Sequence, residues 1–177
     1  NDDIATFSSH PNSPLTAASL AIGEQLGSTG RELVVAWMIG WEVTAQTMKV
    51  CLGPRGNELI NRGWFNQGFQ ETLGVAALAS RLHGLDVEQT RMAIGHAASA
   101  MAGMMKNRGT DTKGFSAGSA AMHGVIAAEL AATDDPDRRS GRKRRGHGLS
   151  EGRSATLAVC AARQASSRVP SASEECS

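Results

Sequence analysis

The sequence predicts an all-α protein, because its composition and the spacing of its apolar residues both favour helices over strands. Aromatic residues make up 4% of the chain and Tyr is absent, whereas Ala, Gly and Met are plentiful. Strands are usually rich in aromatic and β-branched residues, while small side chains let helices approach closely. Apolar residues recur at helical spacing in five segments of residues 1–133, separated by short breaks that contain Gly or Pro. We therefore expect an antiparallel helical bundle or array.

The first two predicted helices lie on either side of a glycine-containing break. The first runs from Leu15 to Leu26, since Ser13 is a typical N-cap residue and Pro14 suits the first helical position. Gly27 begins the break that ends it. The second runs from Arg31 to about Leu52, and its large apolar residues surround most of its circumference, as in a buried helix. We expect this second helix to be the hydrophobic centre of the domain.

The next segment, Asn57 to Gly68, is predicted to be a loop or a short helix. Three further helices are then expected. The third runs from Phe69 to His83, the fourth begins after an N-cap at Asp86 and runs toward Gly103, and the fifth runs from Phe115 to Ala132.

The composition changes after Thr133, so that residues 134–177 differ from the body of the chain. Half of the 18 Lys and Arg residues lie there, although the net charge of the whole chain is only +1. Few large apolar residues remain to offset the entropy of ordering, which predicts a disordered, low-complexity basic tail. The composition also fits an out-of-frame reading of a GC-rich coding region. No aromatic residue interleaves the basic run, so a solvated tail is favoured over a nucleic-acid site.

The sequence also bounds the compartment and the cofactors. No run approaches the roughly 20 apolar residues that cross a membrane, and the polar start lacks the pattern of a signal peptide. Cys51, Cys160 and Cys176 are odd in number and scattered, so that neither a disulfide framework nor a Cys-based metal site is indicated. We expect a soluble, cytoplasmic protein without a bound metal and without a membrane or nucleic-acid partner.

One polar segment stands out as a candidate anion site. Residues 109–118 are rich in Gly, Thr and Ser, contain Lys113, and precede a helix of small residues. Free backbone N–H groups at a helix N-terminus and an ammonium group both attract anions. This combination predicts that Lys113 binds a carboxylate.

Several motifs together resemble the MmgE/PrpD family, which contains 2-methylcitrate dehydratase and cis-aconitate decarboxylase. They are His10-Pro11 ahead of an Ala-rich helix, the run Gly-Arg-Glu-Leu-Val-Val-Ala-Trp-Met-Ile-Gly-Trp-Glu-Val over 30–43, the run Gly-Leu-Asp-Val-Glu-Gln-Thr over 84–90, and Thr-Asp-Thr-Lys over 110–113. The resemblance covers residues 2–133. It implies an all-helical domain, a smaller α+β lid domain with the active site between the two, no metal or organic cofactor, and a homo-oligomer, a dimer in the full-length family.

The resemblance also implies a lyase reaction, in which water or CO₂ leaves a small di- or tricarboxylic acid, and assigns residues to it. His10 matches the family's active-site histidine and is the candidate for proton transfer. Lys113 matches the family's substrate-binding lysine and would pair with a carboxylate. Asp3 and Asp2 correspond to the acidic stretch before that histidine, and either could orient it, share its proton or contact substrate. Ser116 stands where many members have another residue, and is a candidate substrate contact.

Two departures from the family pattern leave a second interpretation open. Where the family commonly has a further active-site histidine after Arg-Gly-Trp, this chain has Phe65. Nothing after Thr133 resembles the rest of the family. The chain is therefore either a lyase acting on a small polycarboxylate or a truncated, catalytically inactive helical remnant. His96 and His123 lie in apolar helices, where a packed structural histidine is the favoured interpretation.

Overall fold

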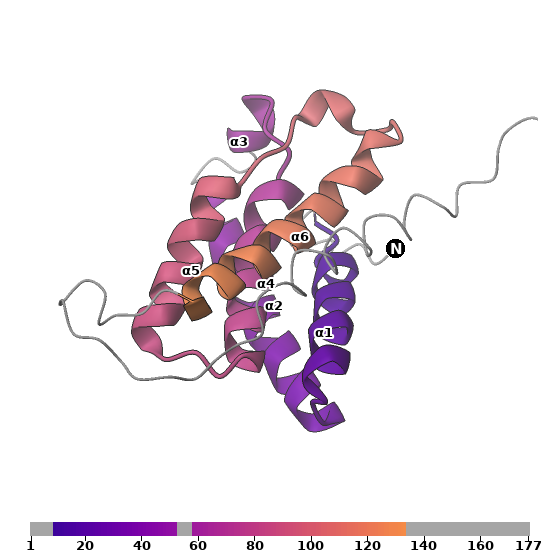
Figure 1. The fold of residues 1–177 in the computed structure, drawn as a ribbon. Coiled ribbons are helices and arrows are strands. Elements are labelled where there is room, and N and C mark those ends of the chain that lie inside the picture. Colours follow the sequence, from indigo (N-terminus) through magenta and orange to yellow (C-terminus); the bar gives the residue numbers. More distant parts are fainter. Residues whose placement is uncertain (1–8, 53–57, 134–177) are drawn as a thin grey trace, which may run out of the picture. The chain divides into compact units, whose positions relative to one another are not determined.

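The structure, a computed structural model, describes residues 9–52 and 58–133, and these form helices without any β-strand (Figure 1). The all-α prediction is confirmed. The elements are α1 (Asn12–Leu26), α2 (Gly30–Leu52), α3 (Glu58–Asn61), α4 (Gln67–Leu82), α5 (Val87–Ala100), the 3-10 helix η1 (Met105–Asn107) and α6 (Thr112–Thr133).

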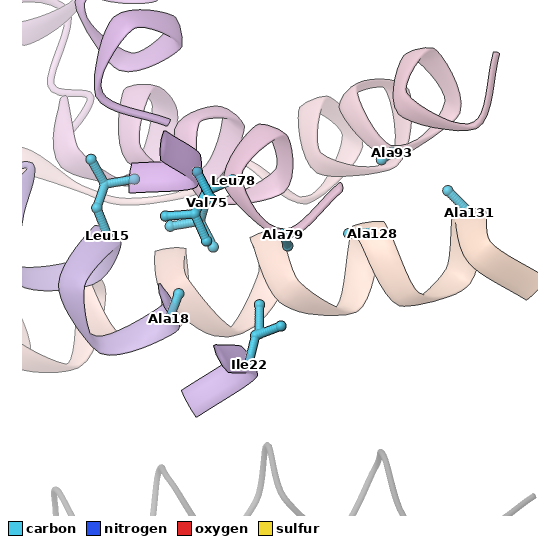
Figure 2. Packing of buried hydrophobic residues seen from close by; sticks show 10 residues of the cluster. Leu15, Ala18, Ile22, Val75, Leu78, Ala79, Ala93, Ala128 and Ala131 are labelled. Carbon is cyan, nitrogen blue, oxygen red and sulfur yellow. The ribbon is translucent and has the colours of Figure 1, made fainter. Parts of the chain in front are cut away.

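The fourth helix, α4, is the centre of the domain, because α1, α2, α5 and α6 all pack against it. Its residues from Val75 to Ser80 are all buried. Figure 2 shows the apolar cluster around it, in which Leu15, Ala18 and Ile22 of α1 and Ala128 and Ala131 of α6 lie about Val75, Leu78 and Ala79 of α4. Most of these side chains are small, so the helix axes can lie close together.

The expectation that the second helix is the hydrophobic centre is wrong. The side chains of Val34 and Met38 are 59% and 60% exposed. The covered face of α2 is instead marked by mostly small residues that recur every four positions, namely Ala36, Gly40, Thr44 and Met48. These small residues determine which face packs, because they let α4 approach closely, and the large apolar residues of α2 remain outside that contact.

Helices α4 and α6 pack against each other and run in the same direction. Gly124 of α6 packs against Thr72 and Val75 of α4, and Ala127 belongs to one apolar cluster with Ala76, farther along both helices. The two contacts advance in the same direction along both helices, so α4 and α6 run parallel. This follows from the connection, since α5 and the segment after it carry the chain back before α6 begins.

The predicted helix ends are partly confirmed. Asp86 is the N-cap of α5, where its carboxylate accepts the Gln89 N–H at 2.8 Å and the Gln89 side chain accepts the Asp86 N–H at 3.2 Å. The predicted Ser13 cap is wrong, because α1 begins at Asn12, two residues before Pro14, and its N-cap is Pro11, whose φ of −65° already suits a helix. Gly27, with φ of 66°, ends α1 in the left-handed conformation.

The proposed basic tail, residues 134–177, lies outside the described residues. Within the described helices, no segment combines the length and the apolar character that crossing a bilayer requires.

His83 follows α4, and burial lowers the pKa of its imidazole, with a smaller opposing contribution from Glu129. The folded state therefore binds this proton less readily than the unfolded state, and stability falls as the pH drops below about 6.5. We expect His83→Gln to lose less stability than the wild type between about pH 7.5 and 5.5. Urea unfolding at the two pH values measures this, with His123→Gln as the control. An unchanged pH dependence in His83→Gln would contradict the assignment.

Candidate functional site

Three segments meet at the N-terminal end of α4. The Phe65 N–H donates to the Gly103 carbonyl at 3.1 Å, and the Met105 N–H donates to the Gly63 carbonyl at 2.8 Å, so the segments before α4 and before η1 lie side by side. The third segment arrives before α1, where the Ser9 hydroxyl donates to the Glu71 carboxylate at 2.8 Å. This end of the bundle therefore gathers the chain next to His10 and the connection that leads to Lys113.

His10 lies between a buried residue and the start of α1, and is itself half-buried. Its carbonyl accepts the Ser13 N–H at 3.4 Å, and the Pro11 carbonyl accepts the Leu15 N–H at 3.1 Å. The backbone on the helical side of His10 is thus fixed by the first turn of α1. His10 is thus anchored by its backbone and keeps part of its surface in solvent.

Lys113 is half-buried and is the second residue of α6, which begins three residues before the predicted position. The predicted cradle of free backbone N–H groups is therefore wrong in part. The Lys113 N–H donates to the Thr110 carbonyl at 3.0 Å, and the Gly114 N–H donates to the Asp111 carbonyl at 3.2 Å. The ammonium group forms no ion pair within residues 9–52 and 58–133. It is the side chain, rather than these amides, that is available to an anion.

Of the remaining candidate residues, the structure describes only Ser116. Ser116 lies one turn after Lys113 and is half-buried, and its hydroxyl donates to the Thr112 carbonyl at 3.0 Å, within its own helix. Its oxygen can still accept a hydrogen bond. Asp2 and Asp3 lie outside the described residues.

The positions of His10 and Lys113 can be compared along α6. Helices α1 and α6 pack against each other, so the two residues belong to neighbouring elements (Figure 1). Gly124 of α6 contacts Thr72 of α4. The residue before Thr72 is Glu71, which accepts the hydrogen bond from Ser9. Lys113 precedes Gly124 by eleven residues, or about 16 Å along the helix axis. Lys113 therefore lies well toward the start of α6 from the point where this helix contacts Thr72.

Phe65 is an apolar residue at the position where the family resemblance implies a histidine. Its side chain is 4% exposed and packs against Gly103. The adjacent Trp64 is 45% exposed and meets the ring of Phe69 edge-on, with a centroid distance of 5.4 Å. The phenyl ring of Phe65 has no ionisable group, so any acid–base chemistry at this end of the bundle has to use other residues.

A buried polar cluster on α4 is the feature that the sequence reasoning missed. Ser9, Gln70 and Glu71 are each 0% exposed, and Gln67 is 3% exposed. Glu71 Oε1 accepts from Ser9 and, at 3.4 Å, from the Gln67 amide. The Gln70 amide has no hydrogen-bond partner among the described residues. The signal was available, because Gln67, Gln70 and Glu71 recur at spacings of three and four in an otherwise apolar helix.

The other histidines and the acidic residues are potential ligands of a metal site. His123 Nδ1 lies 3.3 Å from the Ser119 hydroxyl of its own helix, as a packed structural histidine would. No group of three His, Cys, Asp or Glu side chains in the described part of the chain is arranged to hold a metal ion.

Comparison with known proteins identifies the family of the chain. Cis-aconitate decarboxylase of Homo sapiens and that of Mus musculus are each 31% identical to this chain over 134 residues. The aligned part is 73% of this chain and 27% of each relative, so the chain spans about a quarter of the length of these relatives. No solved structure matches the chain. The model of the MmgE/PrpD N-terminal domain matches residues 2–135, and the chain therefore belongs to the MmgE/PrpD family.

Proposed function

We propose that this chain provides the helical part of a lyase site for a small di- or tricarboxylic acid, from which water or CO₂ leaves. The observation that carries the proposal is the match to the MmgE/PrpD N-terminal domain over residues 2–135. His10 and Lys113 are chosen because the His-Pro and Thr-Asp-Thr-Lys motifs that contain them resemble motifs of the family. The names of the two relatives support cis-aconitate as a substrate to test first.

The roles of the two side chains follow from the charges of such a substrate. The Lys113 ammonium would pair with a carboxylate and stabilise the negative charge that develops next to it as the bond breaks. The His10 imidazole would take a proton from the carbon beside the carboxylate and pass it to the leaving hydroxyl during dehydration. In decarboxylation it would instead deliver a proton to the carbon that loses CO₂. Asp2 or Asp3 would orient this imidazole.

The proposal is tested with the purified 177-residue chain. We expect cis-aconitate or 2-methylcitrate to be consumed, with a change in ultraviolet absorbance as the conjugated double bond is lost or formed. A second readout is binding, in which either acid shifts the NMR signals of His10 and Lys113. If neither turnover nor binding is observed, the alternative of a catalytically inactive helical remnant is favoured.

The lysine is expected to contribute mainly through binding. A hydrogen bond to a charged group contributes about 1.5–3 kcal/mol, so Lys113→Ala should lower kcat/KM by roughly 10- to 100-fold. Steady-state kinetics measure this. Lys106→Ala is the matched control, because Lys106 is an exposed lysine on η1, close to the same end of the bundle. An equal loss in both variants would show a general effect of positive charge and would contradict a specific role for Lys113.

A further inference from the structure

We propose that Glu71 is a positioning residue for His10, and that it acts by binding the hydroxyl of Ser9. The inference rests on the proposed function, since it assigns a support to the histidine that moves the proton. It concerns a buried carboxylate on the central helix that the chemistry above does not use.

The bond between Ser9 and Glu71 joins two elements that are far apart in the sequence. It spans 62 residues, measures 2.8 Å, and links two side chains that are both 0% exposed. Glu71 Oε1 also lies 3.4 Å from the Gln67 amide nitrogen, one turn earlier on α4. Because α4 is packed by four other helices, Glu71 is a fixed point against which the segment before α1 is held.

The segment around His10 is therefore held on both sides. On one side, N–H groups in the first turn of α1 donate to this segment, that of Ser13 to the His10 carbonyl and that of Leu15 to the Pro11 carbonyl. On the other side, the adjacent residue is bound to α4 through its hydroxyl. Each bond limits the rotation of the backbone on its side, so the two together fix the backbone from which the imidazole projects.

The restraint is effective because both partners are buried. A buried polar group that loses its hydrogen bond cannot turn to water instead, so the folded state penalises any conformation in which Ser9 leaves Glu71. The Glu71→Gln variant retains an acceptor oxygen and should weaken the restraint without removing it.

The test follows the accessibility of His10 in the intact chain. Diethyl pyrocarbonate modifies imidazole nitrogens, and peptide mapping by mass spectrometry gives the rate at each histidine. Loss of the buried hydrogen bond should raise the modification rate of His10 about tenfold in Ser9→Ala and in Glu71→Ala, with a smaller rise in Glu71→Gln. The ring signal of His10 in ¹H–¹³C NMR spectra should shift in the same variants.

The matched control is Ser80→Ala. Ser80 is a buried serine on the same helix, 1% exposed, but its hydroxyl bonds to Ala76 within α4, 2.7 Å away. The Ser80→Ala variant should be less stable, but the modification rate and the NMR signal of His10 should not change. Unchanged rates and signals in folded Ser9→Ala and Glu71→Gln would overturn the proposal, even if Glu71→Ala does not fold. The result is independent of turnover, so a chain without lyase activity would defeat the proposed function while the labelling still decides the role of Glu71.

Discussion

Gly74→Ala is expected to destabilise the domain by about 3 kcal/mol or more, at the upper end of what overpacking costs. Gly74 lies where α4 crosses α2, and a Cβ atom at this position would overlap the Thr44 hydroxyl and lie 2.6 Å from the Gly40 carbonyl oxygen. Neither neighbour can easily move. The Thr44 hydroxyl already donates to the Gly40 carbonyl at 2.9 Å, and the carbonyl belongs to the backbone of α2. The two helices would have to separate.

The control for this prediction is a glycine with open space around it. A Cβ at Gly95 of α5 or at Gly118 of α6 would meet nothing within 4 Å. Alanine at such a helical position should stabilise the protein by roughly 0.5–1 kcal/mol, because the unfolded chain loses conformational freedom. Urea unfolding followed by circular dichroism compares the three variants. A Gly74→Ala protein as stable as Gly95→Ala would show that close packing of α2 on α4 is not a source of stability.

The sequence predicted most of the helices because their signals are local. The N-cap at Asp86 and the break that begins at Gly27 are properties of a few neighbouring residues, and both are confirmed. The buried face of α2 is not a local property. It depends on Gly74 of the partner helix, and a pattern of apolar residues in α2 alone favours the large side chains over the small ones that make the contact.

The candidate site was predicted only in part, for a similar reason. His10 and Lys113 were identified from short motifs, and their roles stay predictions. The start of α6 was placed too late, because Gly114 was read as part of a turn, whereas it lies in the first turn of the helix. Glu71 was missed because the importance of a buried carboxylate depends on its partner, and Ser9 is distant in the sequence. Only the tertiary structure brings the two together.

His10→Ala is expected to lower kcat by roughly 10²- to 10⁴-fold, the usual contribution of a positioned acid or base. The KM should change little, since in the proposed function Lys113, rather than the imidazole, binds the substrate carboxylate. Added imidazole should restore part of the rate if the missing group is a proton carrier. The measurement is steady-state turnover of cis-aconitate and 2-methylcitrate by the full chain, with and without imidazole.

The matched control for His10 is His123→Ala, which removes another half-buried imidazole. His123 contacts Ser119 one turn away in α6, so its loss should affect packing and leave the proton transfer intact. Comparing these two variants is informative because Phe65 occupies the position at which the resemblance implies a further histidine. If His123→Ala lost more activity than His10→Ala, the proton carrier would be on α6 rather than before α1. The assignment of His10 would then be wrong, although the assignment of the chain to its family would still hold.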